Sequence, residues 1–90
     1  MANPLFSKRL VQALRAQKKD TEMSMFLSTL LTPKERNDLG VRLEILRRLY
    51  KGEKQRSIAE SLGVGIATVT RGARELQQSG GTLDDILSIK

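Results

Sequence analysis

The sequence contains no cysteine, no histidine and no tryptophan, and aromatic residues make up only 3% of it. Without cysteine there is no disulfide framework and no thiolate zinc site, and without histidine the second common metal ligand is missing. We therefore expect no metal site. No apolar run approaches the roughly 20 residues that a membrane-spanning helix needs, so no membrane partner is expected. The lack of cysteine also fits a reducing cytoplasm.

The chain is short and basic. Its 90 residues make one small domain, and with so few aromatic residues its core must be aliphatic. Chains of this size often gain the missing core from a partner subunit, which is a first reason to expect a homodimer. The net charge of +6 and the pI near 10.2 suit a polyanionic partner. No nucleophile–base pair, metal cluster or phosphate-binding glycine loop is present, so we do not expect an enzyme.

Apolar residues recur at helical spacing throughout, with no strand alternation and no internal repeat. We therefore predict an all-α fold of six short helices. Thr32 and Glu35 have the spacing of a capping box around Pro33, which is a clear helix start, and Thr21 and Thr82 are predicted to cap two other helices. The predicted helices span about residues 4–18, 21–30, 33–51, 55–62, 66–77 and, last, 82–88.

The N-terminal segment, residues 1–19, carries five basic residues and no acidic one. That composition is found in transit peptides and in helices that lie on membrane surfaces. Phe6, Leu10 and Leu14 nevertheless repeat every four residues, which favours a helix that packs through a buried apolar stripe. The first three predicted helices carry wider apolar stripes than one small subunit could cover, so we expect them to pair with a second copy. The basic face of the third helix is expected to be solvated, with Arg36, Arg47 and Arg48.

Residues 55–76 contain the most informative pattern. Two short helices with apolar faces are separated by a tight turn at residues 62–65. Ala59 is small enough to let two helices cross closely, and Gly63 falls where a helix ends in the left-handed conformation. This is the layout of a helix-turn-helix, in which the second helix enters the DNA major groove. The pattern favours a DNA-binding module over an ordinary helical hairpin.

From Leu31 to Leu76 the sequence resembles the bacterial tryptophan repressor family. The stretches that carry the resemblance are LTPKERNDLGVRLEIL, YKGEKQR and, most specific of all, LGVGIATVTRG. The resemblance implies an intertwined all-α homodimer of the Trp repressor type, with a single domain over residues 1–90. Residues 1–51 would then form the dimerisation helices, residues 55–77 the helix-turn-helix and residues 82–89 the C-terminal helix.

The resemblance also implies a function. The chain would be a sequence-specific transcriptional repressor in the bacterial cytoplasm, associated with the nucleoid. Its partners would be a double-stranded DNA operator and a second copy of itself. L-tryptophan would act as the co-repressor, with no other cofactor, by ordering the helix-turn-helix against the core. We expect the motif to be mobile without this ligand, because little apolar surface holds its first helix.

By the same resemblance, Arg42 and Arg71 would hold the ligand, stacking on its indole ring and binding its carboxylate. Gly72 would leave room for the ring. Glu75 stands where the family has a serine that helps to hold the amino group. Its carboxylate would either bind the ammonium or pair with Arg71 across one helical turn and remove the anchor for the ligand carboxylate. The remaining contacts would be the Thr32 hydroxyl and the backbone carbonyls of Thr29 and Leu31.

The DNA-reading residues are also placed by the resemblance. Arg56 matches a strong direct reader, suited to guanine O6 and N7, whose simpler role would be a phosphate clamp. Ala59 matches a lysine of the best-known repressor, so one phosphate contact is expected to be missing. Small apolar groups and hydroxyls at the start of the second helix suit thymine methyl contacts and water-bridged recognition. These residues are Ile66, Ala67, Thr68 and Thr70.

Two other functions stay open from the sequence. One is a helix-turn-helix regulator of the same family that binds DNA without an amino-acid ligand, its arginines serving phosphates. The other is a purely structural helical protein that dimerises. Thermal stability with and without L-tryptophan separates the first alternative from a co-repressor-controlled protein. Binding to a random duplex separates both DNA-binding functions from the structural one.

Overall fold

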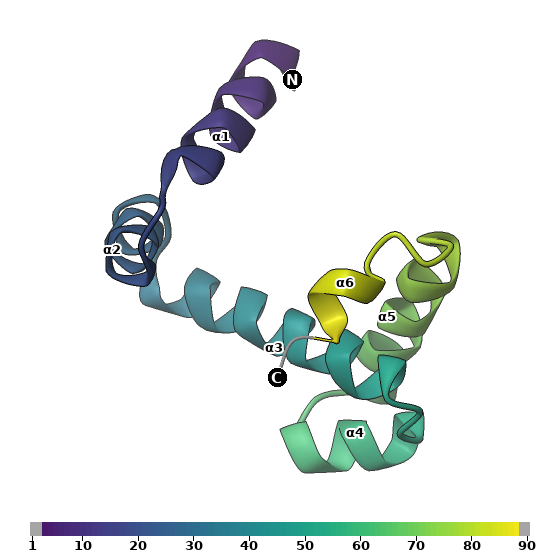
Figure 1. Ribbon diagram of the computed structural model, residues 1–90. Helices are drawn as coiled ribbons and strands as arrows, with labels where there is room; N and C mark the ends of the chain where they lie inside the picture. The colour runs from purple at the N-terminus through teal and green to yellow at the C-terminus, as the bar shows by residue number, and fades with distance from the viewer. Residues whose placement is uncertain (1–2, 89–90) are drawn as a thin grey trace. The chain divides into compact units, whose positions relative to one another are not determined.

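The structure is a computed structural model that describes residues 3–88. Every regular element in this range is an α-helix, so the predicted all-α fold is confirmed (Figure 1). The chain divides into two compact units, Met1–Arg36 and Asn37–Lys90. The helices are α1 (Pro4–Ala16), α2 (Asp20–Leu30), α3 (Pro33–Tyr50), α4 (Gln55–Leu62), α5 (Ile66–Gln78) and α6 (Asp84–Leu87).

The predicted helix bounds lie close to the observed ones, but two predicted caps are wrong. α2 begins one residue before Thr21, because the Lys19 N–H donates to the Glu22 carboxylate (3.2 Å) and closes the first turn there. α6 begins two residues after Thr82 and has no side-chain cap. Residue 89, the predicted end of the last helix, lies outside the described residues.

The first unit contains α1, α2 and the first turn of α3. Asn3 caps α1, since its Oδ1 accepts a hydrogen bond from the Leu5 N–H (2.9 Å), and Pro4 fits the first turn because no N–H is needed there. Neither α1 nor α2 has a buried residue. The apolar stripe of α1 that was predicted to be buried is therefore largely exposed in the single chain, with Phe6 66% and Leu10 46% exposed and Leu14 half-buried.

The start of α3 is fixed by polar contacts. The predicted capping box is confirmed, because the Glu35 N–H donates to the Thr32 hydroxyl (3.1 Å) and the Thr32 N–H donates to the Glu35 carboxylate (2.9 Å). One turn on, the Arg36 guanidinium donates to the Ser24 carbonyl (3.1 Å), the Ser24 hydroxyl (2.9 Å) and the Ser28 hydroxyl (2.6 Å). The expectation that Arg36 is simply solvated is therefore wrong, since it ties α2 to the start of α3.

The second unit contains the rest of α3 with α4, α5 and α6, and α4 and α5 gather around the C-terminal half of α3 (Figure 1). Its core is aliphatic. Ile45 of α3, Ile58 and Ala59 of α4 and Val69 of α5 are all buried in one cluster. The expectation that little apolar surface holds α4 is wrong, because two of its eight residues lie in this core. Further residues pack against the cluster: Val41, Leu49, Leu62 and Val64.

The described part of the chain contains neither a membrane-spanning helix nor a cluster of metal ligands. None of its helices is both long and apolar enough to cross a membrane. Residues 3–88 also contain no group of three or more histidine, cysteine, aspartate or glutamate side chains that could hold a metal ion.

Candidate ligand pocket and DNA-reading face

α4 and α5 form the predicted helix-turn-helix. α4 ends at Gly63, whose φ of 67° and ψ of 33° are left-handed, as the sequence predicted. Glycine adopts this conformation at little cost, and the Val64 N–H then donates back to the Ala59 carbonyl (3.1 Å). Ala59 is 8% exposed and belongs to the same core cluster as Val69 of α5. The small residue that was predicted at the helix crossing therefore lies in the interior of the motif.

The exposed side of the motif carries the residues that were predicted to read DNA. Arg56, in the first turn of α4, is exposed, and its side chain makes no hydrogen bond or ion pair within the described residues. Ile66 begins α5 and is 51% exposed although it is large and apolar, so its side chain is accessible to a groove. The other three predicted residues are exposed as well: Ala67, Thr68 and Thr70.

A hydrogen bond joins the start of α4 to α5. The Thr70 hydroxyl donates to the Gln55 side-chain carbonyl (2.7 Å), which leaves the Gln55 amide NH₂ available. Because Arg56 follows Gln55 directly, this bond ties the turn that carries Arg56 to α5. Gln55 was not predicted from the sequence, because no local pattern indicates which side chain Thr70 would contact across fifteen residues.

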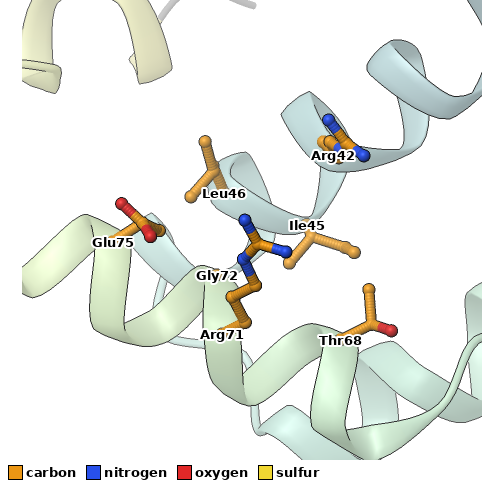
Figure 2. A pocket seen from close by; sticks show the side chains of 7 residues that line it. All are labelled: Arg42, Ile45, Leu46, Thr68, Arg71, Gly72 and Glu75. Carbon is orange, nitrogen blue, oxygen red and sulfur yellow. The ribbon is translucent and has the colours of Figure 1, made fainter. Parts of the chain in front are cut away.

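A hollow of about 340 Å³ lies between α3 and α5 (Figure 2). Ile45 and Leu46 give it an apolar wall and were not predicted. They lie three and four positions after Arg42 on the same face of α3, and that spacing could have identified them. Thr68, predicted to read DNA, also lines the hollow. The complete set of lining residues is Arg42, Ile45, Leu46, Thr68, Arg71, Gly72 and Glu75.

The charged groups of the hollow come from facing helices. Arg42 lies on α3, whereas Arg71 lies on α5 with Glu75 one turn further along (Figure 2). No side-chain hydrogen bond or ion pair joins Arg71 to Glu75 in the described part of the chain. The arrangement in which Glu75 removes the anchor for a ligand carboxylate is therefore not the one adopted here. The hollow offers two cations, one anion and an apolar wall.

Gly72 has a packing role that the sequence did not reveal. A Cβ atom at this position would lie 2.9 Å from Cγ2 of Ile45 and 3.5 Å from Cδ1 of Leu49. Ordinary carbon contacts are about 3.5–4.0 Å, so only glycine permits this approach of α5 to α3. The absence of a side chain at Gly72 thus sets the helix spacing, in addition to leaving room in the hollow that it lines.

The other three predicted ligand contacts belong to the first unit and are not among the residues that line the hollow. The Thr29 hydroxyl donates to the Met25 carbonyl (3.0 Å), and the Thr32 hydroxyl caps α3. Leu31 is half-buried and follows the end of α2. Their roles in ligand binding stay predictions.

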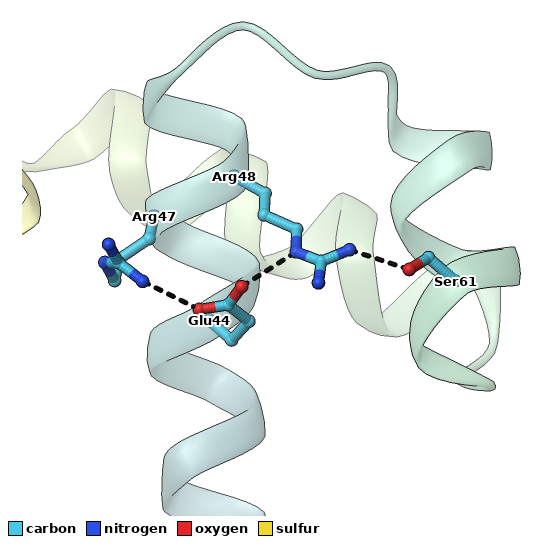
Figure 3. Close-up of polar contacts among 4 residues, drawn as sticks. All are labelled: Glu44, Arg47, Arg48 and Ser61. Carbon is cyan, nitrogen blue, oxygen red and sulfur yellow. Dashed lines mark hydrogen bonds and ion pairs between the residues drawn. The ribbon is translucent and has the colours of Figure 1, made fainter. Parts of the chain in front are cut away.

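A polar network lies on another side of α3 (Figure 3). The Glu44 carboxylate accepts hydrogen bonds from Arg48 Nε (2.8 Å) and from Arg47 Nη1 (3.0 Å). The hydrogen bond from Arg48 is the main reason that the pKa of Glu44 falls below its ordinary value, and the same bond raises the pKa of Arg48. Arg48 Nη1 also donates to the Ser61 hydroxyl of α4 (2.8 Å). The expectation that Arg47 and Arg48 only face solvent is therefore wrong.

A helix-turn-helix whose second helix also lines a ligand-sized hollow defines a class of protein, the helix-turn-helix DNA-binding regulators. Comparison with known proteins identifies the family. A model of the Trp repressor protein family matches residues 7–90. The chain therefore belongs to the Trp repressor family, whose members are transcription regulators rather than enzymes.

Several curated relatives resemble this chain over most of their length. A Trp operon repressor homolog of Vibrio campbellii is 44% identical over 80 residues, which are 88% of this chain and 80% of that protein. The homolog of Vibrio parahaemolyticus is 42% identical over 82 residues, 90% of this chain and 80% of its own. That of Photobacterium profundum is 42% identical over 83 residues, 90% of this chain and 81% of its own. No solved structure matches.

Proposed function

We propose that the chain is a homodimeric transcriptional repressor that binds a double-stranded DNA operator when L-tryptophan occupies the hollow between α3 and α5. The proposal places the protein in the bacterial cytoplasm, associated with the nucleoid. The observation that carries it is the hollow itself, with two guanidinium groups and one carboxylate around an apolar wall, beside a helix-turn-helix. The family match and the relatives' names, Trp operon repressor homologs, support the same function.

The chemistry of the hollow suits an amino acid with an aromatic side chain. Ligand pockets range over about 300–1,000 Å³, so a volume of about 340 Å³ fits a small molecule. The indole would lie on Ile45 and Leu46, and the planar guanidinium groups of Arg42 and Arg71 would stack on it or bind its carboxylate. Glu75 would bind the ammonium, because it has no cation partner within the described residues.

The resemblance adds three contacts to this proposal. The Thr32 hydroxyl would serve the ligand carboxylate, and the backbone carbonyls of Thr29 and Leu31 would face the ammonium. These assignments rest on the family resemblance alone. The main support for an amino-acid ligand is therefore the arrangement of charges in the hollow.

On the DNA side, α5 would lie in the major groove with Ile66 and Ala67 against thymine methyl groups. The hydroxyls of Thr68 and Thr70 would contact bases or phosphates, partly through water. Arg56 would bind the O6 and N7 atoms of a guanine, a role that suits an exposed arginine with no protein partner in the described range. The net charge of +6 supports attraction to the phosphate backbone.

A second copy of the chain is the partner that the exposed apolar residues of the N-terminal helices require. In α1 these side chains are 46–66% exposed, a state that is costly for a chain this small. Light scattering on dilution is expected to show a folded dimer and no compact monomer at micromolar concentration. The exposed apolar residues of α1–α3 are Leu5, Phe6, Leu10, Val11, Met25, Leu30, Leu39, Leu43 and Tyr50.

The ligand would act by filling the hollow and so ordering α4 and α5 against the core, which sets the two recognition helices about one DNA turn apart, roughly 34–36 Å. The ligand can favour the ordered arrangement only by the difference between its affinities for the ordered and the mobile states. A coupling of roughly 1–3 kcal/mol would change operator affinity about 5–150-fold.

The test is isothermal titration calorimetry with L-tryptophan, with L-alanine and indole-3-propionate as controls that lack the ring or the ammonium. DNA is then selected from a random library with and without tryptophan. Heat with tryptophan only, together with tryptophan-dependent enrichment of one sequence, is the expected result. Enrichment without any heat would instead establish the ligand-free regulator. Glu75→Ser is measured in parallel, and weaker tryptophan binding in this variant supports the ammonium contact.

A further inference from the structure

Apolar packing and two polar contacts attach α4 to the rest of the second unit. Ile58 and Ala59 in its middle are buried in the aliphatic core, and its last residue, Leu62, packs against that core. Its first residue, Gln55, is bonded to Thr70 of α5 (2.7 Å). Near its other end, Ser61 accepts a hydrogen bond from Arg48 of α3 (2.8 Å). The two polar contacts lie at opposite ends of a helix only about 12 Å long.

Arg48 is held in place before it reaches α4. Its Nε donates to one oxygen of Glu44 (2.8 Å), four residues earlier on α3, and its Nη1 is left to bind Ser61 (Figure 3). The other oxygen of Glu44 accepts a separate hydrogen bond from Arg47 (3.0 Å), a bond that does not involve Arg48. A planar guanidinium with one edge fixed in this way has few orientations left, so the contact with Ser61 is directional.

We propose that Arg48 is a positioning residue for operator recognition: oriented by Glu44, it holds the C-terminal end of α4 through Ser61 and so sets the direction in which Arg56 meets the DNA. The inference rests on the DNA-binding function proposed above. It concerns a contact between α3 and α4, and Arg48 does not line the hollow between α3 and α5.

The physical reason is the narrow tolerance of a base contact. A hydrogen bond from a guanidinium to a base works only over about 2.7–3.2 Å, and a paired contact must meet that range twice. Apolar packing of Ile58 and Ala59 is not directional, so it resists separation of α4 from the core better than rotation. Contacts at both ends of α4 resist rotation. Loss of the contact at Ser61 would let Arg56 turn away without unfolding the motif.

The test compares Arg48→Gln and Ser61→Ala with the matched control Arg47→Gln. The control removes the same charge from the same helix and also one hydrogen bond to Glu44. Two 30-base-pair duplexes serve as probes, one enriched by the wild-type protein from a random library and one of mixed sequence. Circular dichroism at the assay temperature confirms that every variant is folded.

Arg48→Gln and Ser61→Ala are expected to lower the ratio of enriched-duplex to mixed-duplex affinity about 3–10-fold, the effect of one exposed hydrogen bond. The double variant should lose no more than Arg48→Gln alone, and Ser61→Thr, which keeps the hydroxyl, should retain the wild-type ratio. Arg47→Gln should weaken both duplexes equally. An unchanged ratio in Ser61→Ala, or equal ratios for the Arg48 and Arg47 variants, would overturn the proposal.

A separate measurement distinguishes failure of this inference from failure of the proposed function. If the wild-type protein enriches no sequence, the DNA-binding function itself fails. Amide hydrogen exchange of residues 55–62 then still reports whether Arg48 holds α4. Faster exchange in Arg48→Gln and Ser61→Ala than in Arg47→Gln supports the contact, and identical exchange in all three refutes it.

Discussion

Replacing Gly72 by alanine tests the spacing between α3 and α5 directly. The added Cβ would lie 2.9 Å from Cγ2 of Ile45, where an ordinary contact is about 3.5–4.0 Å. Ile45 is only 2% exposed, and its β-branched side chain has little rotamer freedom, so it cannot simply turn away. α5 must therefore move outward by several tenths of an ångström, at the place where both helices line the hollow.

The magnitude follows from two opposing terms. Overpacking of a buried site costs about 1–3 kcal/mol, whereas exchange of glycine for alanine inside a helix contributes about 1 kcal/mol of stability. The net loss in unfolding free energy for Gly72→Ala is therefore about 0–2 kcal/mol. Gly40→Ala is the matched control, because Gly40 is also helical but a Cβ there has no neighbour within 4 Å in the chain. This control should gain up to about 1 kcal/mol.

The difference in unfolding free energy between the two variants is measured by urea denaturation. Because a dimer is expected, the measurement is made at two protein concentrations. Gly72→Ala should be less stable than Gly40→Ala by about 1–3 kcal/mol, and its tryptophan affinity should fall as the hollow widens. Equal stabilisation by the two substitutions would refute the argument, because it would mean that α3 and α5 are not in close contact. A gain for Gly40→Ala that shrinks as protein concentration rises would mean that the partner subunit covers Gly40.

Three further predictions concern charged groups. Arg42→Ala should abolish the tryptophan response in DNA-binding assays and leave basal DNA affinity nearly intact, whereas Arg71→Ala should abolish the response and also weaken basal DNA binding, because Arg71 lies beside the DNA face. Arg56→Ala should cost about 1–3 kcal/mol on the enriched duplex and relax preference at one base pair, and an equal loss on mixed DNA would make it a phosphate contact. The pKa of Glu44 is lower in the folded state, so its ionised carboxylate stabilises the fold at pH values above the unfolded-state pKa near 4.5. This contribution is lost as the pH falls through the folded-state pKa. Glu44→Gln should thus lose about 0.2–1 kcal/mol at pH 7 and progressively less as the pH is lowered below 4.5 in urea titrations, and a constant difference would exclude the ion pair as its cause.

The features that could be predicted from the sequence are those in which neighbouring residues determine the conformation. Gly63 is left-handed because the turn needs it, and the capping box of Thr32 and Glu35 closes within four residues. The burial of Ile58 and Ala59 follows from their helical spacing to Leu62, four and three residues later, which packs against the same core. Thr21 was misplaced as a cap because a carboxylate nearby closed the first turn one residue earlier.

Contacts between helices were not predictable in the same way. Nothing in the sequence around Arg36 or Arg48 indicates that serines on other helices, eight to thirteen residues away, accept their hydrogen bonds. The close approach at Gly72 depends on the angle at which two helices cross, which the helical period does not fix. The set of charged residues around the hollow came from the family resemblance, and only its apolar wall could have been derived from spacing.

α3 connects the two proposed activities, because different sides of it face α4 and α5. Toward α4 it contributes the hydrogen bond from Arg48, and α4 is in turn bonded to α5 through Gln55 and Thr70. The buried Ile45 packs with residues of both α4 and α5. Toward α5, α3 leaves the hollow, which is filled by no side chain in the described structure. A ligand in this hollow would therefore add contacts that change the packing of α5 without breaking an existing bond. Its effect on DNA is limited to what those contacts contribute, while the direction of Arg56 depends on the separate contact made by Arg48.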